Sequence, residues 1–432
     1  MDDSGHRSGS TRHNVDTSID WPRSLSRPVT AKSYRDGTHR TVAPAETVAR
    51  VRPFLPVIGA TRIANVTGLD RIGIPVVMVC RPNARSISTA QGKGLDLEAA
   101  VASGVMESLE GYHAEHVTRP LKLNSLEELR YTHRMVDVDR LPAIEGSRFH
   151  SRLPTLWIEG YDLLQDDVLW APYEMVHMNC TIPAPPGSGC FPATSTGLAS
   201  GNHPVEALSH ALCEAIERDA LTLWLLRPEA HRRASQIDLD SVDDAACRSV
   251  VEKLHSARFA VAVWDVTSDL GVPAFLCRIA DRDVAGHGAA ATVDGSGCHP
   301  CRSVALLRAV TEAVQSRLTQ ISGTRDDMGR TLYGFDMAAE PADHRSNGAP
   351  AERGKPFRDV ASCEHDTFEA DANWLLGRIR GAGLENAIAV DLTRPEFGVP
   401  VLRVIVPGLE DGIEAPGYAP GPRARAALEA RA

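Results

Sequence analysis

The chain has 432 residues, 43% of them hydrophobic, and a formal net charge of -10. This length can bury one large core or two ordinary ones, and the acidic balance gives no sign of a nucleic-acid-binding surface. No apolar run approaches the roughly 18 residues that a membrane span needs, and the polar start lacks the apolar core of a signal peptide. We therefore expect a cytoplasmic protein without membrane or nucleic-acid partners.

Residues 1–50 are rich in Ser, Arg, His, Asp and Thr and have little periodicity. This composition predicts a mobile polar leader, so residues 1–45 should be removable without loss of ligand binding. Apolar runs bounded by Gly and Pro predict strands over residues 73–82, 260–267, 272–280 and 399–408. Helical periodicity predicts helices over residues 97–113, 204–226, 240–258, 301–320 and 366–384. The elements are interleaved without strict alternation, so we expect an α+β fold of mixed sheets and packed helices.

Two further stretches lie outside this pattern. Residues 336–358 are polar and rich in Pro and Ala, which is typical of a surface loop, and residues 412–432 form a C-terminal tail. Nine cysteines are scattered along the chain, which favours reduced thiols. The sequence CHPC pairs Cys298 with Cys301, but no second pair with zinc-site spacing accompanies it. A zinc enzyme that uses these cysteines and His299 stays open as one alternative.

Three predicted helices share one pattern of polar residues. Glu107, Glu214 and Glu312 can be matched, and three positions later each helix has another acceptor: Glu110, Glu217 and Gln315. Small residues recur three and seven positions before the matched glutamates: Gly104, Ala211 and Ala309, then Ala100, Ala207 and Ala305. Residues at these spacings lie along one flank of a helix. The small residues would let the helices approach closely, and the acceptors would point into a shared space.

Carboxylates that meet in one place repel each other unless a cation compensates them. Mg²⁺ does this well, because a few carboxylates, water and phosphate oxygens satisfy it. Solvated glutamates on amphipathic helices would explain any one helix, but the threefold repetition favours a metal–nucleotide site. Cations suited to polyphosphate lie near the same elements: Arg81, Lys93, Arg218 and Arg308. Neither a Walker A loop nor a Rossmann glycine fingerprint is present.

The segment STGLASGNHPVEALSHALCEAIERDA, residues 195–220, resembles the signature of YcaO-type proteins. Further segments resemble the family in the same order: RPNARSISTAQGKG before SGVMESLE, GCHPCRSVALLRAVTEAVQSR running into GTRDD, and PVLRVIVPGLED. The resemblance covers residues 51–411, which we take as one YcaO domain. It implies a YcaO-type ATP-binding fold, a homodimer, and activation of a peptide backbone amide with ATP and Mg²⁺.

The resemblance also implies roles for individual residues. The expected metal ligands are Glu107, Glu110, Glu206, Glu214, Glu217 and Glu312. Contacts to ATP or its phosphates are expected from Ser103, Asn202, Arg218, Arg308 and Gln315, with Arg81 and Lys93 added from their position in the sequence. An amide oxygen can leave as phosphate once it has attacked ATP, so no protein nucleophile is needed. The sequence shows no convincing Ser-His-Asp or Cys-His arrangement.

Within the family, the nucleophile decides the product. A Cys, Ser or Thr side chain of the substrate gives an azoline, an amine gives an amidine, and external sulfide gives a thioamide, usually with a TfuA partner protein. The last residues here are helix formers rather than the PxPxP tail of ring-forming members, and residues 1–50 are too few for a leader-binding domain. We therefore expect thioamide formation in a peptide or protein substrate. An azoline-forming cyclodehydratase, an accessory factor for ribosomal-protein methylthiolation and a non-catalytic nucleotide-binding scaffold are the alternatives.

Overall fold

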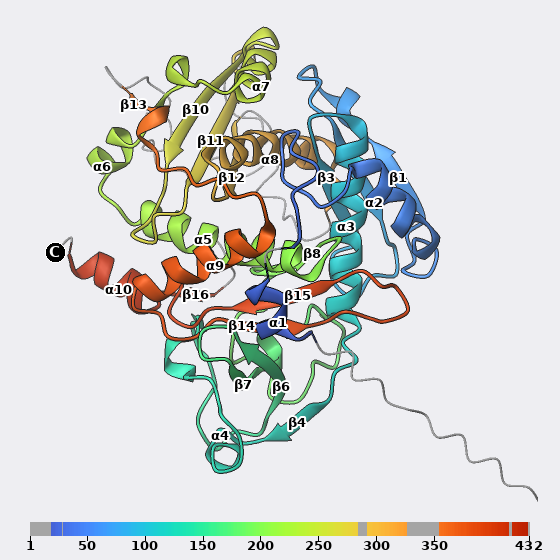
Figure 1. Cartoon of the computed structure of the whole chain (residues 1–432), viewed down its shortest axis with the longest axis vertical. Coiled ribbons are helices and arrows are strands. Elements are labelled where there is room, and N and C mark those ends of the chain that lie inside the picture. Colours follow the sequence, from blue (N-terminus) through green and yellow to red (C-terminus); the bar gives the residue numbers. More distant parts are fainter. Residues whose placement is uncertain (1–18, 28, 284–291, 326–353, 414–416, 431–432) are drawn as a thin grey trace, which may run out of the picture.

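The computed structural model describes residues 19–27, 29–283, 292–325, 354–413 and 417–430 (Figure 1). Helices and several small sheets are mixed, which confirms the α+β fold. The central sheet has the order β4 (Leu121–Asn124), β6 (Thr155–Asp162), β14 (Ile388–Asp391), β15 (Val401–Ile405) and β8 (Leu198–Ser200), and β7 (Asp167–Pro172) also pairs with β6. No helix within these ranges is long and apolar enough to cross a membrane.

Two further sheets are built alike. Each is a three-stranded antiparallel sheet followed by a long helix that packs on its third strand. The N-terminal unit consists of β1 (Arg62–Asn65), β2 (Val76–Cys80), β3 (Thr89–Lys93) and α3 (Leu97–Glu115). The middle unit consists of β10 (Phe259–Asp265), β11 (Ala274–Asp281), β12 (Thr292–Cys298) and α8 (Arg302–Ser322). The chain therefore uses one strand–strand–strand–helix arrangement twice.

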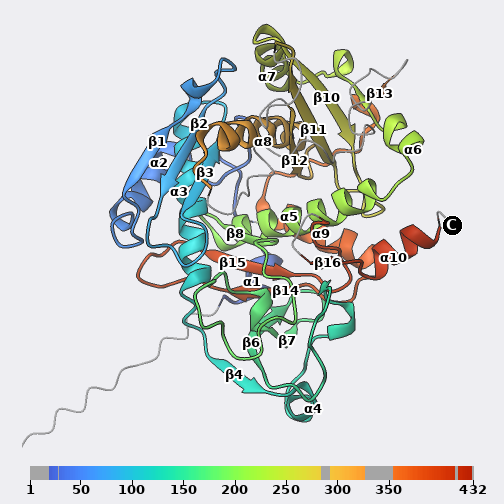
Figure 2. The ribbon, with the colours of Figure 1, turned by 180° about the vertical axis from the view of Figure 1, so that it is seen from behind.

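Helix α5 (Pro204–Leu225) packs against the central sheet through β8 and β15, against β12, and against α9 (Phe368–Gly381). Pro204 in its first turn is favourable there, because the first helical position has no backbone bond to lose. Both ribbon views show α8 above α5, with α3 standing beside them (Figures 1 and 2). The three helices with the shared acidic pattern therefore come from three different parts of the fold.

The remaining elements are shorter. The other α-helices are α1 (Trp21–Ser26), α2 (Pro44–Val51), α4 (Leu126–Leu129), α6 (Glu229–Ala234), α7 (Ala245–Ser256) and α10 (Pro422–Glu429). Two-stranded pairs join β13 (Lys355–Pro356) with β9 (Ile237–Asp238), and β16 (Tyr418–Ala419) with β5 (Ala143–Ile144). Short 3₁₀ turns lie at Arg52–Phe54, Thr67–Leu69, Val138–Arg140, Tyr173–Met175, Leu239–Ser241 and Phe357–Asp359.

The N-terminal part of the chain is more ordered than its composition predicts. The segment before residue 51 contains the helices α1 and α2, where the sequence predicted a mobile leader. Trp21 is buried in the core, and the buried Lys32 ammonium lies 2.5 Å from a carboxylate oxygen of Asp371. Buried polar contacts to residues far away in sequence hold this segment in place, and amino-acid composition cannot reveal such contacts. Residues 1–18 lie outside the described residues.

The predicted surface loop and the predicted C-terminal tail also contain regular structure. Of the expected loop at residues 336–358, only residues 354–358 are described, and they contribute to β13 and the turn Phe357–Asp359. Residues 417–430 of the expected tail form β16 and α10. Arg423 anchors them, because its Nε lies 2.9 Å from Oδ1 of the fully buried Asp219 on α5.

Candidate functional site

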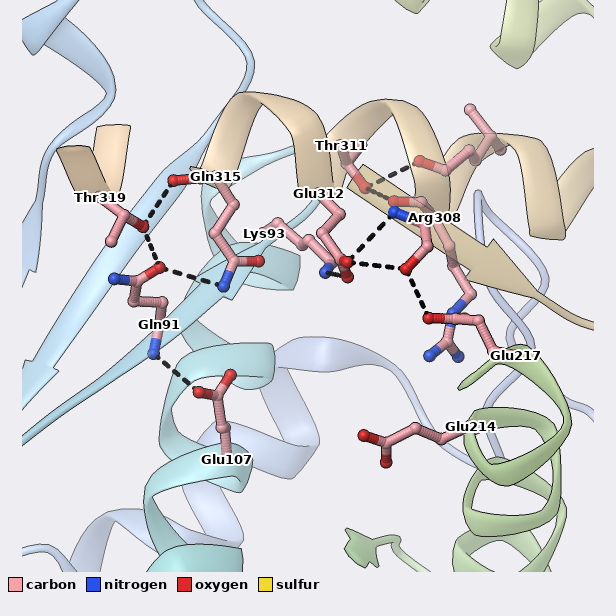
Figure 3. Close-up of polar contacts among 12 residues, drawn as sticks. Gln91, Lys93, Glu107, Glu214, Glu217, Arg308, Thr311, Glu312, Gln315 and Thr319 are labelled. Atoms are coloured by element: carbon pink, nitrogen blue, oxygen red, sulfur yellow. Dashed lines mark hydrogen bonds and ion pairs between the residues drawn. The ribbon is translucent and has the colours of Figure 1, made fainter. Parts of the chain in front are cut away.

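A cavity of about 460 Å³ lies among α3, α5, α8 and strand β3. Its lining includes every residue that the sequence proposed for metal or nucleotide: Arg81, Lys93, Ser103, Glu107, Glu110, Asn202, Glu206, Glu214, Glu217, Arg218, Arg308, Glu312 and Gln315. Side chains from the three helices point toward a common space (Figure 3). The predicted convergence is therefore present, whereas the roles of the individual residues as ligands stay predictions.

The small residues of the pattern bring helices close to strands. A side chain on Gly92 in β3 would place its Cβ 2.0 Å from the carbonyl oxygen of Ala100 and 2.2 Å from the amide nitrogen of Gly104, both on α3. In the middle unit, a Cβ on Gly297 would lie 2.3 Å from the carbonyl oxygen of Ala305 on α8. The expectation of close helix–helix contact was wrong for α3 and α8, because their small residues meet strand backbones.

This close packing places a strand amide beside a helix carboxylate in both units. The backbone N–H of Gln91 donates to Oε1 of Glu107 over 3.3 Å, and that of Ser296 donates to Oε1 of Glu312 over 3.1 Å. Both pairs are 16 residues apart in sequence, so the two units repeat the contact as well as the fold. The sequence showed the glutamates but not the strand residues that orient them.

Charge at Glu312 is well compensated. Its Oε2 accepts a 2.5 Å hydrogen bond from Lys93 Nζ, and Ser296 Oγ donates to its Oε1 over 3.1 Å (Figure 3). Burial opposes ionisation, but the nearby Lys93 and Arg218 outweigh it and lower the pKa of Glu312 to about 2. Glu312 is therefore an anion at every physiological pH.

The α5 carboxylates are less well compensated. Glu217 is buried and lies 2.7 Å from Ser296 Oγ, so it shares the one hydroxyl hydrogen of Ser296 with Glu312. Arg218 Nη2 lies 3.7 Å from Glu217 and 3.9 Å from Glu214. Burial raises the pKa of Glu214 to about 7, with Glu217 adding to the rise and Arg218 opposing it. Glu214 therefore holds its proton more tightly than an exposed glutamate does.

Two carboxylates on α3 behave like Glu214. Burial is the main cause that raises the pKa of Glu107 to about 7 and that of Glu110 to about 8, although Ser200 donates to Glu110 Oε1 from both its N–H and its Oγ over 2.7 Å. Glu107 lines the cavity, where the surrounding protein desolvates its carboxylate although the residue keeps an exposed surface. A divalent cation in the cavity would supply the missing positive charge, so the donor set fits Mg²⁺.

Glu206 and Asn202 form a different part of the lining. Thr41 donates to Glu206 Oε2 from its N–H (2.9 Å) and its Oγ1 (2.7 Å), and Asn202 N–H donates to Oε1 over 3.3 Å. Arg40 Nε lies 3.8 Å from Oε1, and Asn202 Nδ2 donates to Thr47 over 3.0 Å. The N-terminal segment thus supplies part of the cavity wall. Sequence reasoning missed it because the segment looked like a leader.

The predicted phosphate-binding cations differ in their freedom. Arg81 lines the cavity, but its guanidinium is paired with Glu115 and donates to the carbonyl oxygens of Ile58 (3.0 Å) and Ser108 (3.2 Å). These bonds occupy Arg81 inside the protein, so we leave it out of the proposed phosphate contacts. Arg308 Nη2 lies 2.8 Å from His210 Nε2, a contact that orients the guanidinium. Burial, Arg308 and Arg40 lower the pKa of His210 well below its usual range, so the imidazole is neutral.

Gln315 and Ser103 complete the lining. Gln315 Nε2 donates to Gln91 Oε1 over 3.2 Å, which fixes the amide of Gln315 at the junction of β3 and α8. Ser103 lies one helical turn before Glu107 on α3.

The zinc alternative finds no support in the site's geometry. Within the described residues, the one group of side chains spaced for a metal joins His299 with His39 and Asp371 and includes neither Cys298 nor Cys301. His299 Nδ1 accepts a hydrogen bond from the N–H of Cys301 over 3.0 Å, which closes the turn before α8. All nine cysteines are free, as predicted.

A family profile described as YcaO cyclodehydratase, ATP- and Mg²⁺-binding, matches residues 91–410. The chain belongs to the YcaO family. The family's description names ATP and Mg²⁺, which confirms the cofactors predicted from the sequence.

Curated relatives of this YcaO chain include an uncharacterized protein in the tfuA 3′ region of Rhizobium leguminosarum bv. trifolii. It is 36% identical over 376 residues, which is 86% of this chain and 88% of the relative. An uncharacterized protein of Methanothermobacter thermautotrophicus is also 36% identical, over 386 residues, covering 86% and 95% of the two chains.

Solved structures share the fold. The YcaO protein of Methanopyrus kandleri, bound with AMPPCP and Mg²⁺, superposes with a TM-score of 0.69 at 23% identity, over 88% of this chain and 95% of that one. A heterocyclase in complex with substrate and cofactor gives a TM-score of 0.72 at 22% identity and covers 90% of this chain. This chain spans only 55% of the heterocyclase.

Proposed function

We propose that this YcaO protein uses ATP and Mg²⁺ to activate a backbone amide of a peptide or protein, and that the product is a thioamide. The observation that carries the first part is the meeting of carboxylates from α3, α5 and α8 in one cavity with cations beside them. The thioamide part is supported by the relative in the tfuA 3′ region.

ATP would supply the phosphoryl group that turns the amide oxygen into a leaving group, and Mg²⁺ would neutralise the charge of the polyphosphate. The six glutamates would hold the metal, and Arg218 and Arg308 would contact phosphate. Lys93 is held by Glu312 and could contact phosphate only alongside that ion pair. His210 is a neutral acceptor and keeps Arg308 directed at the cavity.

Among the described residues, the side chains that line the cavity include acids, amides and cations but no cysteine. This suits a reaction in which the protein aligns substrate and nucleotide and an outside nucleophile attacks. We propose sulfide as that nucleophile, with a TfuA-type partner to deliver it. A homodimer and a cytoplasmic location stay predictions.

The test is a reaction of purified protein with ATP, Mg²⁺, sulfide, a TfuA-type partner and candidate peptides, followed by mass spectrometry. A peptide that gains sulfur in place of oxygen supports the proposal. Loss of water without added sulfur would instead identify an azoline-forming cyclodehydratase, an activity that the family's description favours. Nucleotide binding without any turnover would identify a scaffold.

A further inference from the structure

A second polar cluster lies outside the cavity, at the start of α9. Cys363 Sγ lies 3.3 Å from His365 Nε2, and His365 Nδ1 lies 2.9 Å from Asp371 Oδ1. Asp371 Oδ2 in turn lies 2.5 Å from the Lys32 ammonium. A thiol, an imidazole and a carboxylate are thus connected in the order that nucleophilic cysteine sites use. We call these four residues the thiol cluster.

The inner half of this cluster is rigidly held. The side chains of Asp371 and Lys32 are fully buried, so their ion pair is shielded from water and salt. Two backbone hydrogen bonds join the two chain segments beside this ion pair. Lys32 N–H donates to the carbonyl oxygen of Asp366 over 3.1 Å, and Phe368 N–H donates to that of Thr30 over 3.0 Å. These contacts hold the Asp371 carboxylate in place between Lys32 and His365.

This orientation sets the proton on His365. Asp371 Oδ1 can only accept, so Nδ1 of His365 carries the hydrogen and Nε2 presents its lone pair to the Cys363 thiol. When the thiol loses its proton to Nε2, the buried carboxylate stabilises the imidazolium. The side chain of His365 is 25% exposed and Cys363 is half-buried, so both residues are partly open to solvent.

A metal ion does not explain the neighbouring imidazoles. His39 and His299 lie with Asp371 at metal-like spacing, and burial followed by nearby cations lowers both pKa values, so both rings are neutral. However, His299 Nδ1 accepts a hydrogen bond from Cys301 N–H, so the hydrogen of the neutral ring lies on Nε2. Neither ring nitrogen of His299 is then free to bind a metal. Lys32 already compensates the Asp371 carboxylate. His39 Nδ1 is buried and finds no hydrogen-bond partner among the described residues.

We propose that Cys363 is a nucleophilic thiol that accepts sulfane sulfur from a persulfide. The choice of sulfur as cargo rests on the proposed thioamide function, which consumes one sulfide for each oxygen replaced. His365 Nε2 takes the thiol proton, and the Cys363 thiolate attacks the outer sulfur of the donor R–S–SH. The donor's S–S bond breaks, a Cys363–S–SH group forms, and the leaving thiolate takes the proton from His365 to give R–SH. Nothing is oxidised or reduced in this transfer, since a sulfane sulfur moves from one thiol to another. Release of the bound sulfur as hydrosulfide needs two electrons, which a second thiol supplies when it attacks Cys363–S–SH and forms a disulfide with Cys363.

The first experiment measures thiol reactivity in the full chain at pH 7 with limiting iodoacetamide and peptide mass spectrometry. Cys180 is the internal control, because it is exposed while burial and Glu115 raise its pKa. We expect Cys363 to be alkylated about tenfold faster than Cys180, and His365→Asn to remove that advantage. Equal rates at the two cysteines, or an unchanged rate in His365→Asn, would overturn the proposal.

The second experiment incubates the protein with inorganic polysulfide, removes excess reagent and blocks with iodoacetamide. The Cys363 peptide should carry one additional sulfur atom, and the His365→Asn protein should carry at least severalfold less. A reactive thiol that gains no sulfur would refute its role as a sulfur acceptor. Thermal unfolding of His365→Asn checks that the fold is intact, and Asp371 is left unchanged because it is buried. Neither experiment needs ATP or peptide, so a failure here would leave amide activation standing.

Discussion

Replacing Gly92 with Ala tests whether strand–helix contact positions the acidic residues. The added Cβ would lie 2.0 Å and 2.2 Å from backbone atoms of α3, and backbone cannot rotate away as a side chain can. Because real Cβ contacts essentially never fall below 3.0 Å, β3 and α3 must separate by roughly 1 Å. Overpacking of this kind costs about 3 kcal/mol of unfolding free energy. A shift of that size between Glu107 on α3 and Glu312 on α8 would also lower ATP turnover by about 100-fold.

The assay combines chemical denaturation with Mg²⁺-dependent ATP turnover. Gly297→Ala should behave alike, because its Cβ would lie 2.3 Å from the carbonyl oxygen of Ala305 in the repeated unit. Gly377→Ala is the matched control: it lies within α9, nothing is within 4 Å of its added Cβ, and Ala should gain up to about 1 kcal/mol there. A Gly92→Ala protein with wild-type stability and turnover would refute the packing argument.

Three further outcomes follow from the site. Glu217→Ala should reduce Mg²⁺-dependent ATP turnover by on the order of 100-fold with the fold intact. The control Glu229→Ala removes a carboxylate from an exposed surface pair and should leave turnover unchanged. Normal turnover in Glu217→Ala would contradict the role of Glu217 as a metal ligand. Contrary to the expectation from the sequence, deletion of residues 1–45 should weaken nucleotide binding, measured by calorimetry, because Thr41 and Arg40 hold Glu206; wild-type affinity would show that this wall is dispensable. Raised carboxyl pKa values make the metal-free fold less stable as pH rises, but the buried neutral histidines have the opposite effect below their ordinary pKa of 6.5. Thermal unfolding without Mg²⁺ should therefore show stability falling between about pH 7 and pH 8, while affinity for Mg²⁺–ATP rises as Glu110 loses its proton; a pH-independent affinity would contradict this.

The sequence by itself determined the long elements and the acidic pattern. Predicted helices at residues 97–113, 204–226 and 301–320 correspond to α3, α5 and α8, because hydrophobic periodicity over many turns is a strong local signal. The glutamates could be matched across these helices for the same reason, since spacing along a helix fixes which side chains share a flank.

Only the tertiary structure decided what those flanks meet. The small residues of α3 and α8 could have packed against helices, and they pack against Gly92 and Gly297 because strand backbone fills the space in front of them. The composition of residues 19–50 gave no sign of structure, yet Lys32 and Arg40 form ion pairs with carboxylates that lie far away in sequence. The sequence did not reveal the thiol cluster for the same reason. Cys363, His365 and Asp371 are near neighbours in sequence, but their hydrogen bonds depend on how the loop before α9 packs against the buried Lys32. Periodicity records local geometry, whereas contacts between distant segments exist only once the chain has folded.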